Sequence, residues 1–207
     1  MVPKSLGVKS AKGLDGASVC IQTGTTTELN LAEYFKGNNI KYNPVPIETN
    51  AEAQELYKAG RCDVYTTDAS GLYATMMSFD NPSDHMVLPE IVSKEPLGPV
   101  VRHGDDQWAD IVSWVLRAMM AAEEKGITSK NVKELAAKDN KDKEINRLLG
   151  KDPLQGLSKL GLSPDWAVNV ISQVGNYQES FEKHLFPLTI KRGMNALYRD
   201  GGLHYIP

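Results

Sequence analysis

The residues best suited to chemistry form a short turn with three consecutive threonines. The segment Gln22-Thr23-Gly24-Thr25-Thr26-Thr27-Glu28 lies between a β-prone run and a helical pattern. Gly24 permits a sharp backbone turn, and Thr25 with Glu28 fits a helix capping box. Free N–H groups at a helix start, together with adjacent hydroxyls, can bind an anion such as a carboxylate. Alternatively, the threonines only cap the helix, and the spacing alone favours this simpler interpretation.

A second candidate residue is Asp68, which ends the run from Gly60 and stands just before another helical pattern. Ligands of open α/β sheets bind beyond the carboxyl ends of parallel strands. We therefore expect Asp68 and the Thr25–Thr27 turn on one edge of one sheet. Donors for an anion beside a carboxylate for a cation suit a zwitterion such as a free amino acid. The alternative is that Asp68 only caps the following helix.

The remaining side chains indicate neither catalysis nor a metal site. The four histidines follow no metal-ligand spacing, and Cys20 and Cys62 lack the neighbouring cysteine of a zinc or C-x-x-C redox motif. The two cysteines are either buried thiols or one disulfide. A net charge of -3 argues against a basic nucleic-acid-binding face. No apolar run reaches the ~18 residues of a membrane helix, and none at the N-terminus has signal-peptide length.

Strand and helix patterns alternate along the first half of the chain. We expect strands at 17–22, 40–48, 62–66 and 86–92, and helices at 25–35, 51–59 and 69–77. Pro44 and Pro46 favour an edge position for the second of these strands. Strands separated by short helices are typical of βαβ units, so the sequence predicts an α/β fold with a largely parallel sheet.

The second half is predicted to be almost entirely helical. After one brief strand at 98–102, we expect helices at 106–125, 131–138 and 143–149, a long helix from Ser163-Pro164 to 181 with a bend at Gly175, and a short helix at 191–198. The apolar stripe of helix 106–125 needs a covering surface. These helices therefore either pack on each other or cover a sheet contributed from elsewhere.

Six motifs together strongly resemble the general L-amino-acid-binding proteins of polar amino-acid ABC importers. They are Val19-Cys20-Ile21-Gln22-Thr23-Gly24-Thr25-Thr26-Thr27-Glu28-Leu29-Asn30, Gly60-Arg61-Cys62-Asp63-Val64-Tyr65-Thr66-Thr67-Asp68, Lys94-Glu95-Pro96-Leu97-Gly98-Pro99, Gly104-Asp105-Asp106-Gln107-Trp108, Val174-Gly175-Asn176-Tyr177 and Arg192-Gly193-Met194-Asn195-Ala196-Leu197. The resemblance runs from Met1 to Pro207.

The resemblance implies a periplasmic-binding-protein-like (type II) lobe with a parallel or mixed sheet, followed by a helix-rich C-terminal segment. It implies a periplasmic protein whose partners are an L-amino acid and the membrane permease of an ABC importer, without a cofactor. By motif position, Thr25, Thr26 and Thr27 would bind the α-carboxylate, and Asp68 the α-ammonium. The resemblance also implies a Cys20–Cys62 disulfide.

One departure from the family pattern is that the chain starts inside it, without the first part of lobe one. We therefore expect residues 1–95 to form lobe two and residues 96–207 to be a helical return into lobe one. Such a truncated chain would bind its ligand weakly or not at all, and could form a homodimer through exposed lobe-one helices. Two alternatives remain: a self-associating or regulatory remnant, and a dehydratase on the same fold with Asp68 or Glu28 as the acid.

Overall fold

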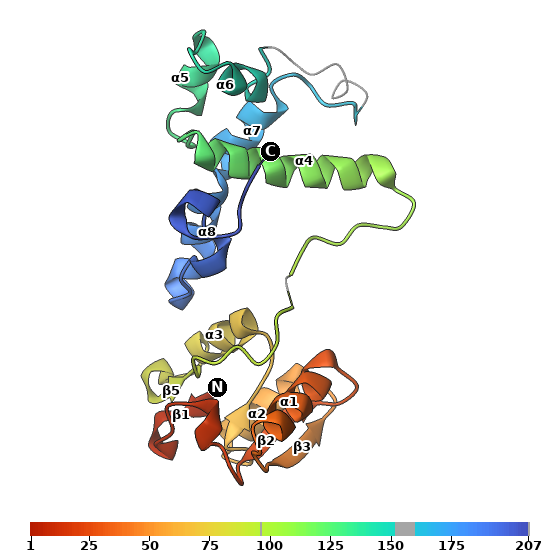
Figure 1. Ribbon diagram of the computed structural model, residues 1–207, viewed down its shortest axis with the longest axis vertical. Helices are drawn as coiled ribbons and strands as arrows, with labels where there is room; N and C mark the ends of the chain where they lie inside the picture. Colours follow the sequence, from red (N-terminus) through yellow and green to blue (C-terminus); the bar gives the residue numbers. More distant parts are fainter. Residues whose placement is uncertain (96, 152–159, 207) are drawn as a thin grey trace. The chain divides into compact units, whose positions relative to one another are not determined.

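The computed structural model describes residues 1–95, 97–151 and 160–206. The chain divides into two compact units, Met1–Pro96 and Leu97–Pro207. The first unit carries the strands and the second is helical, as Figure 1 shows. None of the helices in the described residues is both long enough and apolar enough to cross a lipid bilayer.

The centre of the first unit is a three-stranded parallel sheet in the order β3-β2-β4. Its strands are β2 (Ser18–Gln22), β3 (Asn43–Ile47) and β4 (Val64–Tyr65). β3, with its two prolines, takes the edge position that the sequence predicted, because proline cannot donate a hydrogen bond to a second neighbour. A separate antiparallel pair joins β1 (Val2–Pro3) to β5 (His85–Met86).

Helices cover this sheet because β2 is apolar on both faces. Val19 and Ile21 pack with α1 (Thr26–Gly37), whereas Cys20 packs in a second cluster with α2 (Asn50–Lys58). Successive side chains of a strand point to opposite faces, so three consecutive buried residues require a cover on each side. The third helix, α3 (Ala69–Met77), has the bounds that the sequence predicted. Short 3-10 turns η1 (Lys4–Leu6), η2 (Ala11–Gly13) and η3 (Pro82–Asp84) complete the unit.

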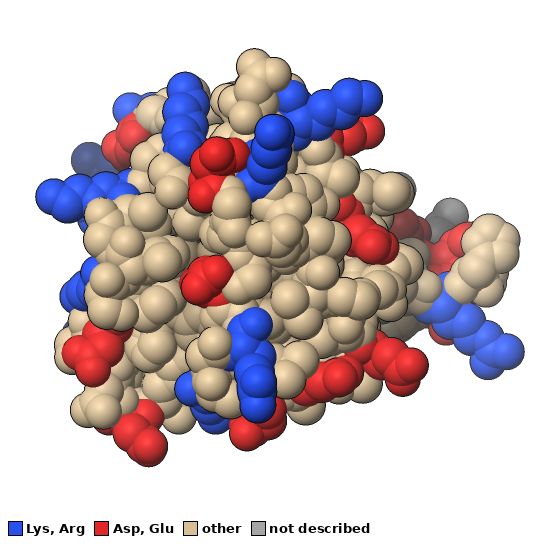
Figure 2. Space-filling view, turned by 90° about the horizontal axis from the view of Figure 1, so that it is seen from below, with Lys and Arg blue, Asp and Glu red and all other residues tan. Residues whose placement is uncertain are grey.

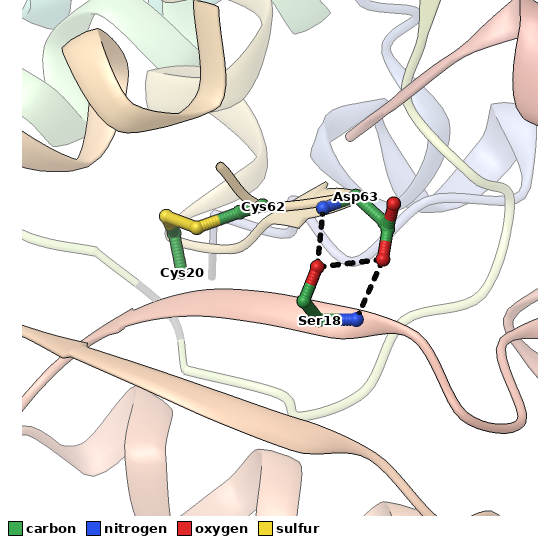
Figure 3. The surroundings of a disulfide bond; sticks show 4 residues. All are labelled: Ser18, Cys20, Cys62 and Asp63. Atoms are coloured by element: carbon green, nitrogen blue, oxygen red, sulfur yellow. Dashed lines mark hydrogen bonds between the residues drawn. A yellow bond between two sulfur atoms is a disulfide. The ribbon is translucent and has the colours of Figure 1, made fainter. Parts of the chain in front are cut away.

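A disulfide and an aspartate join β2 to the chain just before β4. Cys20 and Cys62 form the implied disulfide and are buried. One residue along, the Asp63 carboxylate accepts hydrogen bonds from the Ser18 N–H at 2.8 Å and the Ser18 hydroxyl at 2.6 Å. Ser18 Oγ in turn accepts from the Asp63 N–H at 3.0 Å. Figure 3 shows these contacts side by side. The β2–β4 register is therefore held by covalent and charge-assisted contacts together.

The second unit consists of five helices in its described residues, without a strand. They are α4 (Asp106–Glu124), α5 (Val132–Ala137), α6 (Lys143–Leu148), α7 (Trp166–Val174) and α8 (Tyr177–Leu185), followed by the 3-10 turns η5 (Phe186–Leu188), η6 (Gly193–Asn195) and η7 (Tyr198–Asp200). The helices pack on each other around Ala122, Ile127 and Ile171. At the start of the α4 stripe, Trp108 is 52% exposed, whereas Ile111 and Val112 are half-buried.

Several predicted elements were wrong in extent or kind. The strand expected at 98–102 is absent, since no described strand of that unit is there to pair with it. The strand expected at 86–92 is reduced to His85–Met86, which is all that β1 pairs. The helix expected at 191–198 is replaced by the 3-10 turns η6 and η7.

The long helix expected from Ser163-Pro164 to 181 is two helices that meet at Gly175. That residue has φ +83° and ψ -178°, a conformation that is nearly restricted to glycine. A Cβ there would come within 2.7 Å of Glu179 Cβ. Asn176 then starts α8 with a capping box that includes Glu179. The Val174-Gly175-Asn176-Tyr177 motif therefore specifies a helix break and a new cap.

The disulfide is predicted to be a major stabilising bond of the first unit. Replacing both Cys20 and Cys62 with alanine should lower the free energy of unfolding by about 4 kcal/mol on the chain-entropy model for a loop of this length. Urea denaturation followed by circular dichroism measures the change. Reduction of the unmodified protein should give a similar loss, and equal midpoints with and without reductant would contradict the prediction.

The hydrogen bonds between Asp63 and Ser18, called here the Asp63–Ser18 clasp, predict a specific dependence of stability on pH. Hydrogen bonds from the Ser18 hydroxyl and the Ser18 N–H lower the pKa of Asp63. A carboxyl whose folded pKa is lowered stabilises the fold above its unfolded pKa of about 3.9, and the stabilisation is lost as pH falls further. At pH 7, Asp63→Asn should therefore cost about 1 kcal/mol.

Unfolding free energies measured from pH 7 to pH 2 test this dependence. The gap between the unmodified protein and Asp63→Asn should close as the pH falls below about 4. The exposed Asp80 supplies the control variant Asp80→Asn, which should show no such gap at any pH. A gap of constant size throughout the range would contradict the role of the ionised carboxylate.

Candidate functional site

The three parallel strands bring three helix starts to one edge of the sheet. Val19 pairs with Val64 and Cys20 with Tyr65, so β2 and β4 run in the same direction side by side. Their carboxyl ends therefore share an edge, and so does that of β3. α1 and α3 begin just beyond β2 and β4. The structure thus brings the Thr25–Thr27 turn and Asp68 to the same edge of the sheet, as the sequence predicted.

Thr25 is the N-cap of α1, and its hydroxyl is already committed. It accepts from the Glu28 N–H at 3.3 Å and donates to the Gln22 carbonyl at 2.7 Å. The Glu28 carboxylate turns back and accepts from the Gly24 N–H at 2.8 Å. The Thr25 and Glu28 side chains therefore satisfy the backbone groups of the turn. The interpretation as a helix cap holds for Thr25, whose hydroxyl proton is not available to a ligand in this arrangement.

Thr26 and Thr27 differ from Thr25 in what remains available. As the first residues of α1, both have backbone N–H groups without an acceptor inside the helix. The Thr26 hydroxyl donates to the Glu95 carboxylate at 3.2 Å. The half-buried Thr27 hydroxyl has no hydrogen bond among the described residues. The helix start thus offers two N–H groups and the Thr27 hydroxyl to an anion.

Asp68 stands at the N-cap position of α3, but its side chain makes no capping hydrogen bond. The capping interpretation predicted such a bond, so it was wrong for this residue. By contrast, Thr25 and Thr49 both cap their helices, α1 and α2, through their hydroxyls. The exposed Asp68 carboxylate is therefore open to a cation from solution.

The role of Glu95 was missed by the sequence analysis. Its carboxylate accepts from the Thr26 hydroxyl and from the side-chain amide of Asn30, one turn further along α1. The separations of 69 and 65 residues along the chain hide both contacts from any local pattern. The only signal was its place in the Lys94-Glu95-Pro96 motif, to which no role had been given.

The sequence of this chain is similar to those of several proteins with descriptive names. The chain is 56% identical over its full length to the general L-amino acid-binding periplasmic protein AapJ of Rhizobium johnstonii. It is 54% identical over its full length to the glutamate/glutamine/aspartate/asparagine-binding protein BztA of Rhodobacter capsulatus. It is 52% identical over 97% of its length to a putative amino-acid ABC transporter-binding protein, YhdW, of Escherichia coli. No family model matches the chain.

A solved structure shares the fold as well as the sequence. The ABC transporter periplasmic binding protein from Brucella ovis, which has glutathione bound, matches the whole chain with a TM-score of 0.92 and 50% identity. The fold is thus that of a type II periplasmic binding protein. The chain is homologous, along its whole length, to the amino-acid-binding periplasmic proteins of ABC transporters.

The chain spans about three fifths of the length of these relatives. It covers 61% of the Rhizobium protein, 62% of the Rhodobacter protein and 66% of the Brucella chain. The functions of the full-length relatives are therefore assigned to this chain only as a proposal.

The different roles of Thr25 and Thr27 give a prediction for stability. Thr25→Ala removes the cap of α1 and should weaken the helix by about 1 kcal/mol. Thr27→Ala removes a hydroxyl with no described partner and should change stability by less than about 0.5 kcal/mol. Amide hydrogen exchange of α1 measures both effects. Thr49→Ala, which uncaps α2, is the positive control and is read from the α2 amides, and equal protection of α1 in Thr25→Ala, Thr27→Ala and the unmodified protein would contradict the assignment.

Proposed function

We propose that this chain captures polar L-amino acids in the periplasm as part of the solute-binding component of an ABC importer. The observation that carries the proposal is the shared sheet edge. There, the N–H groups at the start of α1 and the Asp68 carboxylate, which makes no capping hydrogen bond, follow neighbouring parallel strands. The amides and side-chain hydroxyls of Thr26 and Thr27 bind the α-carboxylate. Asp68 binds the α-ammonium. The membrane permease is the partner that receives the ligand.

This site supplies only part of the affinity that a transport protein needs. Charge-assisted hydrogen bonds contribute about 1.5–3 kcal/mol each. One such interaction at the α-carboxylate and one at the α-ammonium, the two poles of the ligand, give a total of about 3–6 kcal/mol. A Kd of 1 mM corresponds to about 4.1 kcal/mol. Binding by these groups alone therefore falls between roughly 40 μM and several millimolar, before the entropic cost of association weakens it further. Tighter binding would require further groups to close over the ligand, as in hinge-closing proteins.

The relatives suggest that the head group matters more here than the side chain. One is named for general L-amino acids and another for two acidic amino acids and their amides. The Brucella protein holds glutathione, whose γ-glutamyl end carries a free α-ammonium and α-carboxylate. All these molecules share one zwitterionic head. We therefore include γ-glutamyl peptides in the ligand class.

The test is a titration of the isotope-labelled 207-residue chain, followed through its backbone amide signals by nuclear magnetic resonance. L-Glutamine, L-glutamate and glutathione should each shift the amides of Thr26 and Thr27. N-acetyl-L-glutamine lacks the ammonium, and L-glutaminamide lacks the carboxylate, so each should bind at least about tenfold more weakly. Asp68→Asn should weaken L-glutamine binding to a similar degree. Asp80→Asn, the matched control three residues beyond the end of α3, should leave it unchanged.

Other outcomes would favour the alternatives. Equal binding of L-glutamine and its blocked derivatives would contradict recognition of the zwitterion. Submicromolar binding would contradict the argument that the described groups form only part of a site. Turnover of prephenate or arogenate would favour the dehydratase, whereas the relatives are named as binding proteins. Self-association without ligand binding would favour a regulatory remnant. The comparisons give no support to the expected homodimer, which is no part of the proposal.

A further inference from the structure

The Glu95 carboxylate contacts Thr26, one of the residues proposed to bind a ligand carboxylate. Glu95 lies one residue before the end of the first unit. Its two oxygens accept hydrogen bonds from the Thr26 hydroxyl, at 3.2 Å, and from the Asn30 side-chain amide. Thr26 and Asn30 are four residues apart on a helix, so they lie on the same face. A carboxylate of the chain itself is thus bound along the first two turns of the helix.

This contact is not needed to cap the helix. Thr25 accepts from the Glu28 N–H, and Glu28 accepts from the Gly24 N–H, so the α1 start is capped by its own residues. Glu95 instead accepts from the Thr26 hydroxyl and the Asn30 side-chain amide, neither of which takes part in the cap. Removing the Glu95 carboxylate therefore leaves the helix cap intact.

The Thr26 hydroxyl cannot serve Glu95 and a ligand carboxylate at the same time. A threonine hydroxyl has one proton to donate, and a carboxylate can only accept. While Thr26 donates to Glu95, its oxygen has only lone pairs left to offer. A second negative charge would also compete with Glu95 for the positive end of the helix dipole. The two carboxylates therefore exclude each other at this hydroxyl.

We propose that Glu95 is an internal latch on the carboxylate-binding turn, which a ligand carboxylate displaces when it binds. The proposal rests on the proposed function, since the displacing group is the α-carboxylate of an amino acid. In the unliganded chain, Glu95 holds Thr26 and Asn30 and ties the end of the first unit to α1. Ligand binding frees Glu95 and Asn30 from each other. The latch thus lowers ligand affinity and couples binding to the release of the segment at residue 95.

The test compares the unmodified chain with Glu95→Ala, using L-glutamine as the probe and magnetic resonance signals as the readout. Without the competing carboxylate, the Kd for L-glutamine should fall by about fivefold. Glu95→Gln, which keeps one acceptor oxygen but no charge, should give an intermediate value. Glu33→Gln is the matched control, because Glu33 is an exposed carboxylate on α1 without a described hydrogen bond. It should leave the Kd unchanged.

The side-chain amide of Asn30 reports the latch directly. In the unmodified chain, adding L-glutamine should move the Asn30 amide signals toward the positions that they have in Glu95→Ala. If the Thr26 and Thr27 backbone amides respond while the Asn30 signals stay fixed and Glu95→Ala has an unchanged or higher Kd, the latch is wrong and the proposed function stands. If neither protein responds to L-glutamine at Thr26 and Thr27, the proposed function fails and the latch fails with it.

Discussion

The parallel pairing of β2 with β4 is the constraint on which the candidate site depends. Parallel strands must end at the same edge, so the turn after β2 and the turn after β4 lie beside each other. A slip of one residue would turn every side chain of β4 to the opposite face. The Cys20–Cys62 disulfide and the Asp63–Ser18 clasp oppose such a slip from one end of the pair. The geometry of the proposed ligand site thus depends on contacts at the start and middle of β2 and just before β4.

Residues within one motif can stabilise the fold or bind a ligand. The hydrogen bonds that each residue makes within the chain distinguish these two roles. In the turn after β2, the Thr25 and Glu28 side chains form hydrogen bonds with backbone groups of the turn itself. The Thr26 and Thr27 N–H groups are left without an acceptor inside the helix. In the second unit, Arg192 of the last motif binds the buried Glu123 carboxylate at 2.8 Å. That pair fixes the C-terminal segment to α4. Glu28 and Glu123 are therefore structural, whereas the exposed Asp68 has no such partner in the described residues.

On the face shown in Figure 2, both acidic and basic side chains occur among uncharged residues, in keeping with a net charge of -3. Recognition of a small zwitterion needs only a few charges at defined places. The proposed site accordingly uses one carboxylate and one helix start.

Sequence patterns predicted most of the first unit because its signals are local. The Thr25-x-x-Glu28 cap, the glycine turn and the alternation of strand and helix all act over a few residues, and α3 has the predicted bounds. The second unit was predicted less well. The helical pattern predicted a bend at Gly175, but not that the backbone at φ +83° ends one helix and that Asn176 caps a new one. A strand at 98–102 would need a neighbouring strand, which the apolar pattern alone could not supply.

The same limit applied to the candidate site. Its shared sheet edge followed from strand order and could be predicted, whereas the contact of Glu95 with Thr26 spans 69 residues and could not. Whether a side chain in a capping position makes the capping bond also required the structure. Asp68 and Thr25 stand in the same position of their helices, yet only Thr25 caps.

The most direct test of the two-pole account is a crystal structure of this chain grown with a saturating concentration of L-glutamine. The account predicts that the α-carboxylate lies within hydrogen-bonding distance of the Thr26 and Thr27 amides, and the α-ammonium within the same distance of an Asp68 oxygen. A glutamine bound in the reverse orientation, or at a place that touches neither group, would contradict it.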